Sequence, residues 1–301
     1  MTVTNKISTP TPATILASTL EINTEKNDLD PYLVILSGLD QGKQYRLHRQ
    51  FNAIGRNGNT DIHIMDSKVS RNHGTLIIYP DCIVFKDNQS TNGSYVNDIR
   101  IQSQEIEASA RIRIGNTIMK IEYKKASEVK IENALYNAAN TDNLTKILNR
   151  HAFMSRAEEE VLSCIQNNER LAIIMCDVDH FKRINDNFGH PAGDRILMDL
   201  AEVLQSQMRK NDMLARYGGE EFIMLLRNEE TDSIAKLAER TRQKVEQYDF
   251  SFEDTQIPTT LSIGVCNRTG IEINSLSALI KEADNALYQA KNNGRNSVKI
   301  T

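Results

Sequence analysis

The stretch Arg216-Tyr217-Gly218-Gly219-Glu220-Glu221-Phe222 (RYGGEEF) places two adjacent glycines before two adjacent carboxylates in an otherwise apolar segment. The flanking runs DMLARY and EFIMLL have the composition of strands, so the glycines predict a hairpin turn in which they can adopt positive φ. Because no side chain covers such a turn, a flat ligand or a phosphate can lie against its backbone. Glu220 and Glu221 begin the outgoing strand on opposite faces, so at least one should stand beside that ligand.

A further carboxylate follows the apolar run LAIIMCD, whose last residue is Asp177. A charged group at the end of a buried strand is costly unless it is solvated, paired or bound to a cation. If this strand neighbours the hairpin, Asp177 and Glu220 can hold Mg²⁺ between themselves and a nucleoside triphosphate. The alternative is an ordinary turn with a solvated acidic rim, and the short motif alone does not separate the two interpretations.

The segments around the hairpin predict an α+β domain. Apolar residues recur at helical spacing after Asp194, around 232–247 and from Leu276 to Leu287. Strands are expected at LAIIMCD, at the two arms of the hairpin, at TTLSIGVC and at SVKI. The order β-α-β-β-α-β-α-β fits an antiparallel sheet covered by helices on one face, close to the ferredoxin-like palm.

Residues 142–301 resemble the GGDEF domain of the diguanylate cyclase family, in its GGEEF variant. Besides the signature, the resemblance rests on DNLTKILNR (142–150), DVDHFKRINDNFGHPAGD (177–194), LSIGV (261–265) and ADNALYQAKNNGRN (283–296). It implies condensation of two GTP molecules into cyclic di-GMP with release of pyrophosphate. It also implies Mg²⁺ or Mn²⁺ as the cofactor, and a homodimer in which two sites, each holding one GTP, face each other.

The resemblance assigns roles to individual residues. The metal ligands would be Asp177, Glu220 and the main-chain carbonyl of Val178, and Glu220 or Glu221 would accept the proton. The remaining substrate contacts would come from Asn185 and Asp194 at the guanine edge, and from Lys182, Gly218, Gly219, Lys291 and Arg295. Two alternatives are an inactive, degenerate domain, which the intact signature disfavours, and a cyclase that accepts ATP in one half-site, which Asp194 disfavours.

A second predicted site lies just upstream of the hairpin. Arg209-Lys210-Asn211-Asp212 has the R-x-x-D spacing that many GGDEF domains use to bind their own product. Guanidinium groups suit phosphate and the acceptor edge of guanine, and Arg240 on the next expected helix would contribute another. The sequence therefore predicts product inhibition, with an ordinary charged helix end as the alternative.

The first half of the chain has a different pattern. Over about 32–123, short apolar or alternating runs such as YLVILSG, GTLIIYP and ARIRIGN are broken by turn residues, which predicts a β-sandwich. Three polar motifs lie between the strands and would form a pocket for a dianion at one end of it: Gly55-Arg56, Ser70-Arg71-Asn72-His73-Gly74 and Thr91-Asn92-Gly93. In this order they resemble a forkhead-associated (FHA) domain, which binds phosphothreonine peptides.

The FHA resemblance also implies residue roles. The phosphopeptide contacts would be Arg56, Ser70, Arg71 and Asn92, with Thr91 as a further candidate, while His73 holds its loop in place. The alternative is a sandwich whose polar loops only cap strands.

The predicted organisation is a flexible tail (1–30), an FHA domain (31–124), a linker helix (125–141) and a GGDEF domain (142–301). Ile131, Leu135 and Ala138 share one stripe of the linker helix, which could pair with its own copy. The tail threonines are candidates for phosphorylation and for docking on the FHA domain of the same or a partner chain, with a passive leader as the alternative. They are Thr2, Thr4, Thr9, Thr11, Thr14, Thr19 and Thr24.

Composition limits the class of protein. A net charge of -4 over 301 residues provides no general basic field for nucleic acid or anionic lipid. The four cysteines lack C-x-x-C spacing, and no apolar run approaches the roughly 20 residues of a membrane span. We therefore expect a cytoplasmic protein that binds no nucleic acid and inserts in no membrane. The main functional alternative is a phosphothreonine adaptor whose C-terminal half only binds cyclic di-GMP, which the intact catalytic positions argue against.

Overall fold

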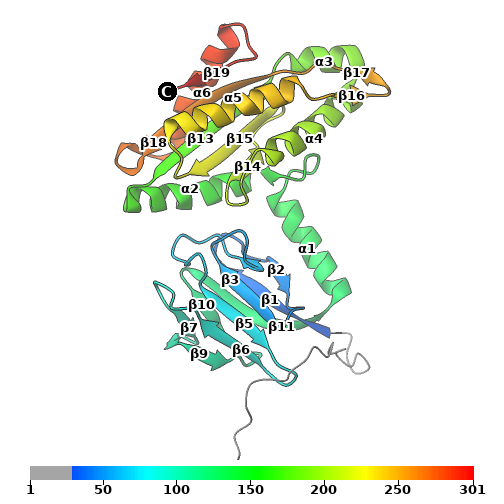
Figure 1. The fold of residues 1–301 in the computed structure, drawn as a ribbon. Coiled ribbons are helices and arrows are strands. Elements are labelled where there is room, and N and C mark those ends of the chain that lie inside the picture. The colour runs from blue at the N-terminus through cyan, green and yellow to red at the C-terminus, as the bar shows by residue number, and fades with distance from the viewer. Residues whose placement is uncertain (1–28) are drawn as a thin grey trace, which may run out of the picture.

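The computed structural model describes residues 29–301, in which a β-sandwich is followed by a helix and an α/β domain (Figure 1). The tail threonines, and with them the predicted docking of the tail, lie outside the described residues. The helix that joins the two domains runs along one side of the molecule (Figure 1).

The N-terminal domain consists of two sheets, with the strand orders β2-β1-β11-β10-β7-β8 and β4-β3-β5-β6-β9. The strands are β1 (Leu29–Ser37), β2 (Gln44–Arg46), β3 (Phe51–Gly55), β4 (Ile62–His63), β5 (Gly74–Ile78), β6 (Ile83–Asp87), β7 (Ser94–Val96), β8 (Ile99–Ile101), β9 (Ser103–Glu105), β10 (Ile112–Ile114) and β11 (Thr117–Lys125). Apolar residues of both sheets, among them Leu33, Leu76, Phe85 and Ile112, share one buried core. The β-rich first half predicted from the alternating runs is confirmed.

The linker is helix α1 (Ala126–Asn140). Its predicted apolar stripe does not pack within the chain, since Ile131 and Leu135 are 65% and 67% exposed. The helix instead contacts the sandwich through Val129, which is buried with Tyr32 and Val34 of β1. The side of α1 that carries Ile131 and Leu135 is therefore left without an apolar partner in the described chain.

A buried polar cluster connects the sandwich, the linker helix and the α/β domain. The Arg156 guanidinium donates from Nη2 to Oδ1 of Asp40 and to the hydroxyl of Tyr136, each at 3.0 Å. The Tyr136 hydroxyl also donates to Asp40 Oδ1 at 3.0 Å. Because Arg156 comes from helix α2 (Arg150–Asn167), Asp40 from the sandwich and Tyr136 from α1, we call these three residues the interdomain joint.

The C-terminal domain is built on a six-stranded sheet with the order β12-β14-β15-β13-β18-β19. The strands are β12 (Leu148–Asn149), β13 (Arg170–Val178), β14 (Met213–Arg216), β15 (Glu221–Arg227), β18 (Leu261–Thr269) and β19 (Val298–Ile300), with a separate hairpin of β16 (Ser251–Phe252) and β17 (Thr255–Gln256). The helices are α2 (Arg150–Asn167), α3 (Phe181–Phe188), α4 (His190–Ser206), α5 (Thr231–Glu246), the 3-10 helix η1 (Gly270–Glu272) and α6 (Leu276–Asn292). The four inner strands are antiparallel, whereas the outer pairs β12/β14 and β18/β19 are parallel.

The prediction that helices cover one face of this sheet is wrong, because they cover both. Ile174 and Cys176 of β13 pack with residues of α3, α4 and α5, whereas Ile173 and Met175 pack with residues of α2 and α6. A strand buried on both faces reads as a continuous apolar run, and LAIIMC is such a run. The second layer of helices is held close to the sheet, since a Cβ on Gly264 of β18 would lie 2.1 Å from a main-chain oxygen of α6.

Candidate active site

The RYGGEEF stretch forms the turn between the antiparallel strands β14 and β15. The Arg216 guanidinium closes the turn by donating to the main-chain oxygen of Gly219 at 2.7 and 3.0 Å. Neither Gly218 nor Gly219 has positive φ, so the expectation of left-handed glycines is wrong. A Cβ on Gly218 would lie 2.4 Å from Oε2 of Glu221, whereas one on Gly219 would meet nothing within 4 Å. The end of the Glu221 side chain thus lies over Gly218, and Gly219 leaves open space at the turn.

The strand that ends with Asp177 and Val178 is a neighbour of the strand that begins directly after Glu220. In the antiparallel register of β13 and β15, Asp177 lies opposite Glu221. The main-chain N–H of Val178 donates to the main-chain oxygen of Glu220 at 3.3 Å. The condition for a cation shared by Asp177 and Glu220 is therefore met.

The two carboxylates lie in an environment that disfavours their charge. Asp177 is only 6% exposed, and burial raises its pKa even though the Lys291 ammonium lies 2.7 Å from Oδ2 and opposes the rise. Burial also raises the pKa of Glu220, and the negative charge of Asp177 raises it further. The site thus carries negative charge that its surroundings do not neutralise, and a bound divalent cation would favour both charged forms.

The donor atoms fit a hard divalent cation. Among residues 29–301, no three His, Cys, Asp or Glu side chains gather into a complete metal site. Mg²⁺ does not require one, because it is usually held by one or two carboxylates together with water and substrate phosphates. Two carboxylates and the main-chain oxygen of Val178, which ends the same strand as Asp177, provide oxygen donors of this kind.

Helix α6 and the segment after it bring cationic side chains to the carboxylates. Lys291, in the last turn of α6, forms the ion pair with Asp177, and the charge of Arg295 also opposes the rise that burial causes in the pKa of Asp177. A carboxylate that we did not predict holds this segment in place. Asp179 is buried and accepts hydrogen bonds from Ser262 Oγ at 2.6 Å and from the main-chain N–H of Asn296 at 2.9 Å.

Asp179 also accepts from the Thr260 hydroxyl at 2.8 Å, so its oxygens are occupied by the protein. We therefore regard it as a residue that positions Arg295. Its place two residues after Asp177, at the end of the same buried strand, is the signal that could have identified it.

The predicted guanine-binding residues come from two consecutive helices. Asn185 lies on α3, and Asp194 lies in the first turns of α4. A Cβ on Gly193 would lie 2.0 Å from Oδ1 of Asn185, so this glycine lets Asn185 pack against the start of α4 beside Asp194. Asp194 and Lys182 are exposed, and within residues 29–301 no hydrogen bond or ion pair joins Lys182 to the carboxylates.

A comparison with protein-family models gives a match for this half of the chain. Residues 139–297 match the model described as diguanylate cyclase, GGDEF domain, and this range is more than half of the chain. The chain belongs to the GGDEF diguanylate cyclase family. The sequence-based recognition of this domain is thereby confirmed.

Curated relatives agree with the family assignment. The GGDEF domain is 37% identical over 170 residues to diguanylate cyclase A of Treponema denticola, covering 56% of this chain and 46% of that protein. It is 39% identical over 170 residues to diguanylate cyclase DgcM of Escherichia coli, covering 56% of this chain and 40% of that protein. The chain thus spans less than half the length of either relative.

Solved structures show the same fold. The coiled coil and GGDEF domain of DgcB from Caulobacter crescentus, in complex with c-di-GMP, matches with a TM-score of 0.54 and 28% identity, covering 58% of this chain and 95% of that one. Diguanylate cyclase SiaD in complex with its activator SiaC, from Pseudomonas aeruginosa, matches with a TM-score of 0.53 and 32% identity, covering 58% of this chain and 66% of that one.

The N-terminal half matches a different family model. Residues 34–125 match the model described as inner membrane component of T3SS, cytoplasmic domain, a family with an FHA-like fold. No helix within residues 29–301 is long and apolar enough to cross a membrane.

The predicted product site of the GGDEF domain occupies the loop between α4 and β14. The main-chain N–H of Arg209 donates to Oδ2 of Asp212 at 2.8 Å, while the Arg209 side chain is exposed and pairs with Glu229. Burial raises the pKa of Asp212. Arg240 of α5 donates from Nε to Gln207 Oε1 at 3.1 Å, which brings all three predicted residues to this loop.

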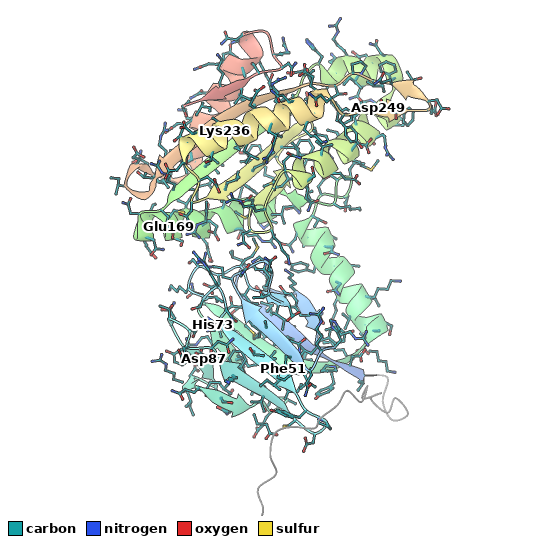
Figure 2. The ribbon with its side chains drawn as sticks, in the orientation of Figure 1. Phe51, His73, Asp87, Glu169, Lys236 and Asp249 are labelled. Carbon is teal, nitrogen blue, oxygen red and sulfur yellow. The ribbon has the colours of Figure 1, made fainter. Side chains whose placement is uncertain are left out.

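The three polar motifs of the sandwich also meet. The Ser70 hydroxyl accepts from the main-chain N–H of Thr91 at 3.0 Å, and the main-chain oxygen of Ser70 accepts from the main-chain N–H of Arg56 at 3.0 Å. Asn92 donates from Nδ2 to the main-chain oxygen of Lys68 at 2.7 Å. His73 is fully buried in the sandwich (Figure 2) and accepts at Nδ1 from the main-chain N–H of Ser70, which supports the loop.

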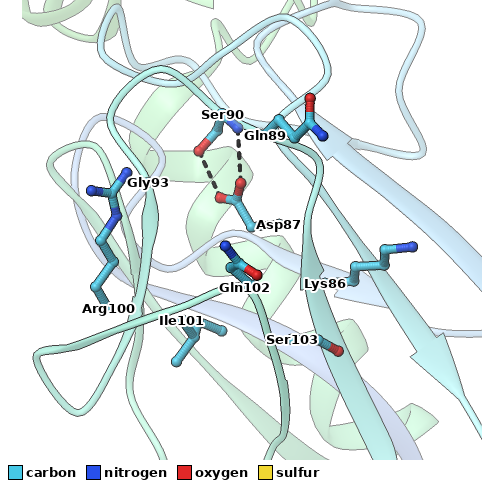
Figure 3. A pocket seen from close by; sticks show the side chains of 9 residues that line it. All are labelled: Lys86, Asp87, Gln89, Ser90, Gly93, Arg100, Ile101, Gln102 and Ser103. Carbon is cyan, nitrogen blue, oxygen red and sulfur yellow. Dashed lines mark hydrogen bonds between the residues drawn. The ribbon is translucent and has the colours of Figure 1, made fainter.

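A hollow of about 800 Å³ also lies on the sandwich. It is bounded by β6, the loop after β6, and the β8–β9 segment (Figure 3). Its carboxylate, Asp87, accepts from the main-chain N–H and the hydroxyl of Ser90 at 2.8 and 2.6 Å, and it also contacts Ser94. None of the residues predicted to bind a phosphopeptide lines it. Since its carboxylate holds its own loop, we assign this hollow a structural role.

Proposed function

We propose that the protein condenses two GTP molecules into cyclic di-GMP. Each 3′-oxygen attacks the α-phosphorus of the opposing GTP, its proton is lost, and the bond to pyrophosphate breaks, so two pyrophosphates are released. The observation that carries the proposal is the pair of Asp177, near the end of β13, and Glu220, the turn residue directly before β15, with both pKa values raised. The family membership of residues 139–297 supports it independently.

Each side chain of the site has a place in this reaction. Asp177, Glu220 and the main-chain oxygen of Val178 would hold Mg²⁺ or Mn²⁺, which when bound supplies positive charge to the phosphates. Glu220 is the stronger candidate for proton acceptor, because the Glu221 side chain lies over Gly218. Lys291 and Arg295 lie beside Asp177, where they would offset charge on the triphosphate.

The choice of nucleobase falls to Asn185 and Asp194. An amide and a carboxylate together offer both donors and acceptors, which matches the edge of guanine. Adenine has an amino donor where guanine has an acceptor oxygen, so it would leave polar groups of such a site unpaired. We therefore propose GTP as the substrate at both half-sites.

The activity is tested by incubating the purified full chain with Mg²⁺ and either GTP or ATP and separating the nucleotides by chromatography. We expect cyclic di-GMP and pyrophosphate from GTP, no cyclic product from ATP, and no reaction without a divalent cation. Synthesis absent in both the wild type and Arg209→Ala, with cyclic di-GMP still bound by the wild type, would instead support an adaptor that only receives the dinucleotide.

Catalysis requires two GGDEF domains, because one site holds one GTP. We propose a homodimer formed through α1, whose side chains Ile131 and Leu135 are exposed and apolar. In DgcB a coiled coil accompanies the GGDEF domain, which supports a helical dimer element in this position.

Replacing both Ile131 and Leu135 by glutamate is expected to weaken the dimer at least about tenfold, since each buried aliphatic side chain contributes roughly 1.5–3 kcal/mol. Sedimentation would show a monomer at concentrations where the wild type is dimeric, and the specific activity would fall with dilution. Asn137→Glu, on the same helix and also exposed, is the control for added charge. A double variant that remains dimeric would contradict this role for α1.

We further propose that the sandwich binds phosphothreonine peptides through Arg56, Ser70, Arg71 and Asn92, with Thr91 holding the Ser70 hydroxyl. The convergence of the three loops and the match of residues 34–125 to a family of FHA-like fold support this proposal. A phosphorylated tail threonine of the same or the partner chain is one candidate ligand. The sandwich would then control how the two cyclase domains meet.

A further inference from the structure

A pocket of about 380 Å³ lies between the two domains. Arg56 and Arg71 line it from the sandwich, and Arg209, Lys210 and Asp212 line it from the GGDEF domain. The two sides are in direct contact, because the main-chain N–H of Gly58 donates to Oδ1 of Asn211 at 2.8 Å. Two of the three loops predicted to bind a phosphopeptide, those of Arg56 and Arg71, thus share one cavity with the loop predicted to bind the product.

The pocket has an excess of positive charge. Five cationic side chains line it, against the two carboxylates of Glu160 and Asp212: Arg56, Arg71, Arg209, Lys210 and Arg227. Two of them have acidic partners, since Arg227 pairs with Glu160 and Glu169, and Arg209 pairs with Glu229. Within residues 29–301, Arg56, Arg71 and Lys210 have no ion-pair partner.

This arrangement fits a single phosphate-bearing ligand. The volume lies near the lower end of the range of about 300–1,000 Å³ that encloses one small-molecule ligand. Guanidinium groups favour phosphate oxygens, and they are present on both walls. Two anionic ligands in the same cavity would compete for these groups and repel each other.

We propose that a phosphothreonine segment and cyclic di-GMP exclude each other from this interdomain pocket. This inference rests on the proposed function, and it adds a link between the two domains. A ligand on Arg56 and Arg71 weakens the binding of the dinucleotide at Arg209 and Asp212, and the dinucleotide weakens the binding of the phosphothreonine segment by the same factor. The phosphorylation signal would thereby relieve product inhibition, and the cyclase would continue to work at a higher product concentration.

The test measures the binding of fluorescently labelled cyclic di-GMP to the full chain by anisotropy. The competitor is a nine-residue peptide library with phosphothreonine at its centre, and the unphosphorylated library is its control. We expect the apparent Kd of the dinucleotide to rise in proportion to the phosphopeptide concentration, without reaching a plateau. The reverse titration, with labelled phosphopeptide, should show displacement by cyclic di-GMP.

Two variants test separately whether the product site binds the dinucleotide and whether the sandwich contributes to that binding. Arg209→Ala should abolish dinucleotide binding, and Arg71→Ala should weaken it about tenfold or more, as expected for the loss of a charge-assisted hydrogen bond. Arg111→Ala, an exposed arginine of the sandwich outside the pocket, is the matched control and should leave the Kd unchanged.

Three results would overturn the inference in different ways. A ternary complex, with both ligands bound at their separate affinities, would refute exclusion while leaving both proposed binding sites intact. A phosphopeptide library that does not bind would refute the phosphothreonine function, and exclusion with it. Dinucleotide binding that is unaffected by Arg209→Ala would refute the product site.

Discussion

The Glu220→Gln variant is expected to lose cyclic di-GMP synthesis by a factor of about 10²–10⁴, the range for removal of a positioned acid–base group. The change also removes one of the two carboxylates that would hold the divalent cation, and glutamine keeps the shape of the side chain. The rate of product formation from GTP, followed by chromatography at saturating Mg²⁺, measures the loss.

The same variant should fold as well as the wild type. Burial and Asp177 raise the pKa of Glu220, so its charged form is disfavoured in the folded state. A carboxyl with a raised folded pKa makes the folded protein less stable above that pKa, and this cost disappears as pH falls through it. At pH 7 a neutral glutamine should therefore not lower the free energy of unfolding.

Glu158→Gln provides the matched control, because Glu158 is exposed on α2 and the substitution is chemically identical. It should change neither synthesis nor stability. Full activity in Glu220→Gln, or loss of activity that parallels loss of folded protein, would contradict the assignment of Glu220.

The second large effect is expected at the interdomain joint. In Arg156→Ala the carboxylate of Asp40, which is 3% exposed, loses its closest cation. Breaking a buried ion pair by removing one partner costs about 3–5 kcal/mol, because the remaining charge stays buried. Lys43 lies farther away, 3.7 Å from Asp40 Oδ2, so it is a weaker partner than Arg156. Denaturant unfolding of the full chain measures the loss.

An exposed pair of similar geometry serves as the control. Arg46 and Asp30 lie 2.7 Å apart, with side chains 57% and 37% exposed. Exposed pairs contribute about 0–1 kcal/mol, so Arg46→Ala should have little effect. The double variant Asp40→Asn, Arg156→Met should be more stable than Arg156→Ala, since no buried charge remains. Equal losses for Arg156→Ala and Arg46→Ala would show that the joint does not depend on its buried charge.

The sequence was sufficient to predict those features that depend on local chemistry. The alternating runs predicted the β-rich half, and the GGEEF hairpin follows from turn residues between two apolar strands. The carboxylate at the end of LAIIMCD was expected to be solvated, paired or bound to a cation, and it forms an ion pair with Lys291. These inferences each involve a single strand or turn.

Features that depend on packing could not be read from the chain. LAIIMC is apolar on both sides, but this pattern does not indicate which helices cover each face of the sheet. Helix α2 was not predicted, and the sheet was therefore expected to have helices on one face only. Gly218 was expected to adopt positive φ, whereas it does not, and the end of the Glu221 side chain lies over it. The ion pair of Asp40 and Arg156 joins residues 116 positions apart, so no local pattern indicates it.

The contact between Gly58 and Asn211 changes how the R-x-x-D motif should be compared across relatives. A Cβ on Gly58 would lie 2.6 Å from Oδ1 of Asn211 and 2.8 Å from Cγ of Lys210. The residues at the two middle positions of the motif, Lys210 and Asn211, therefore pack closely against the sandwich. In chains with the same pair of domains, positions 58, 210 and 211 should vary together. Where a GGDEF domain follows another kind of sensor domain, the residues at the two middle positions of the motif should instead be those that fit the surface of that sensor.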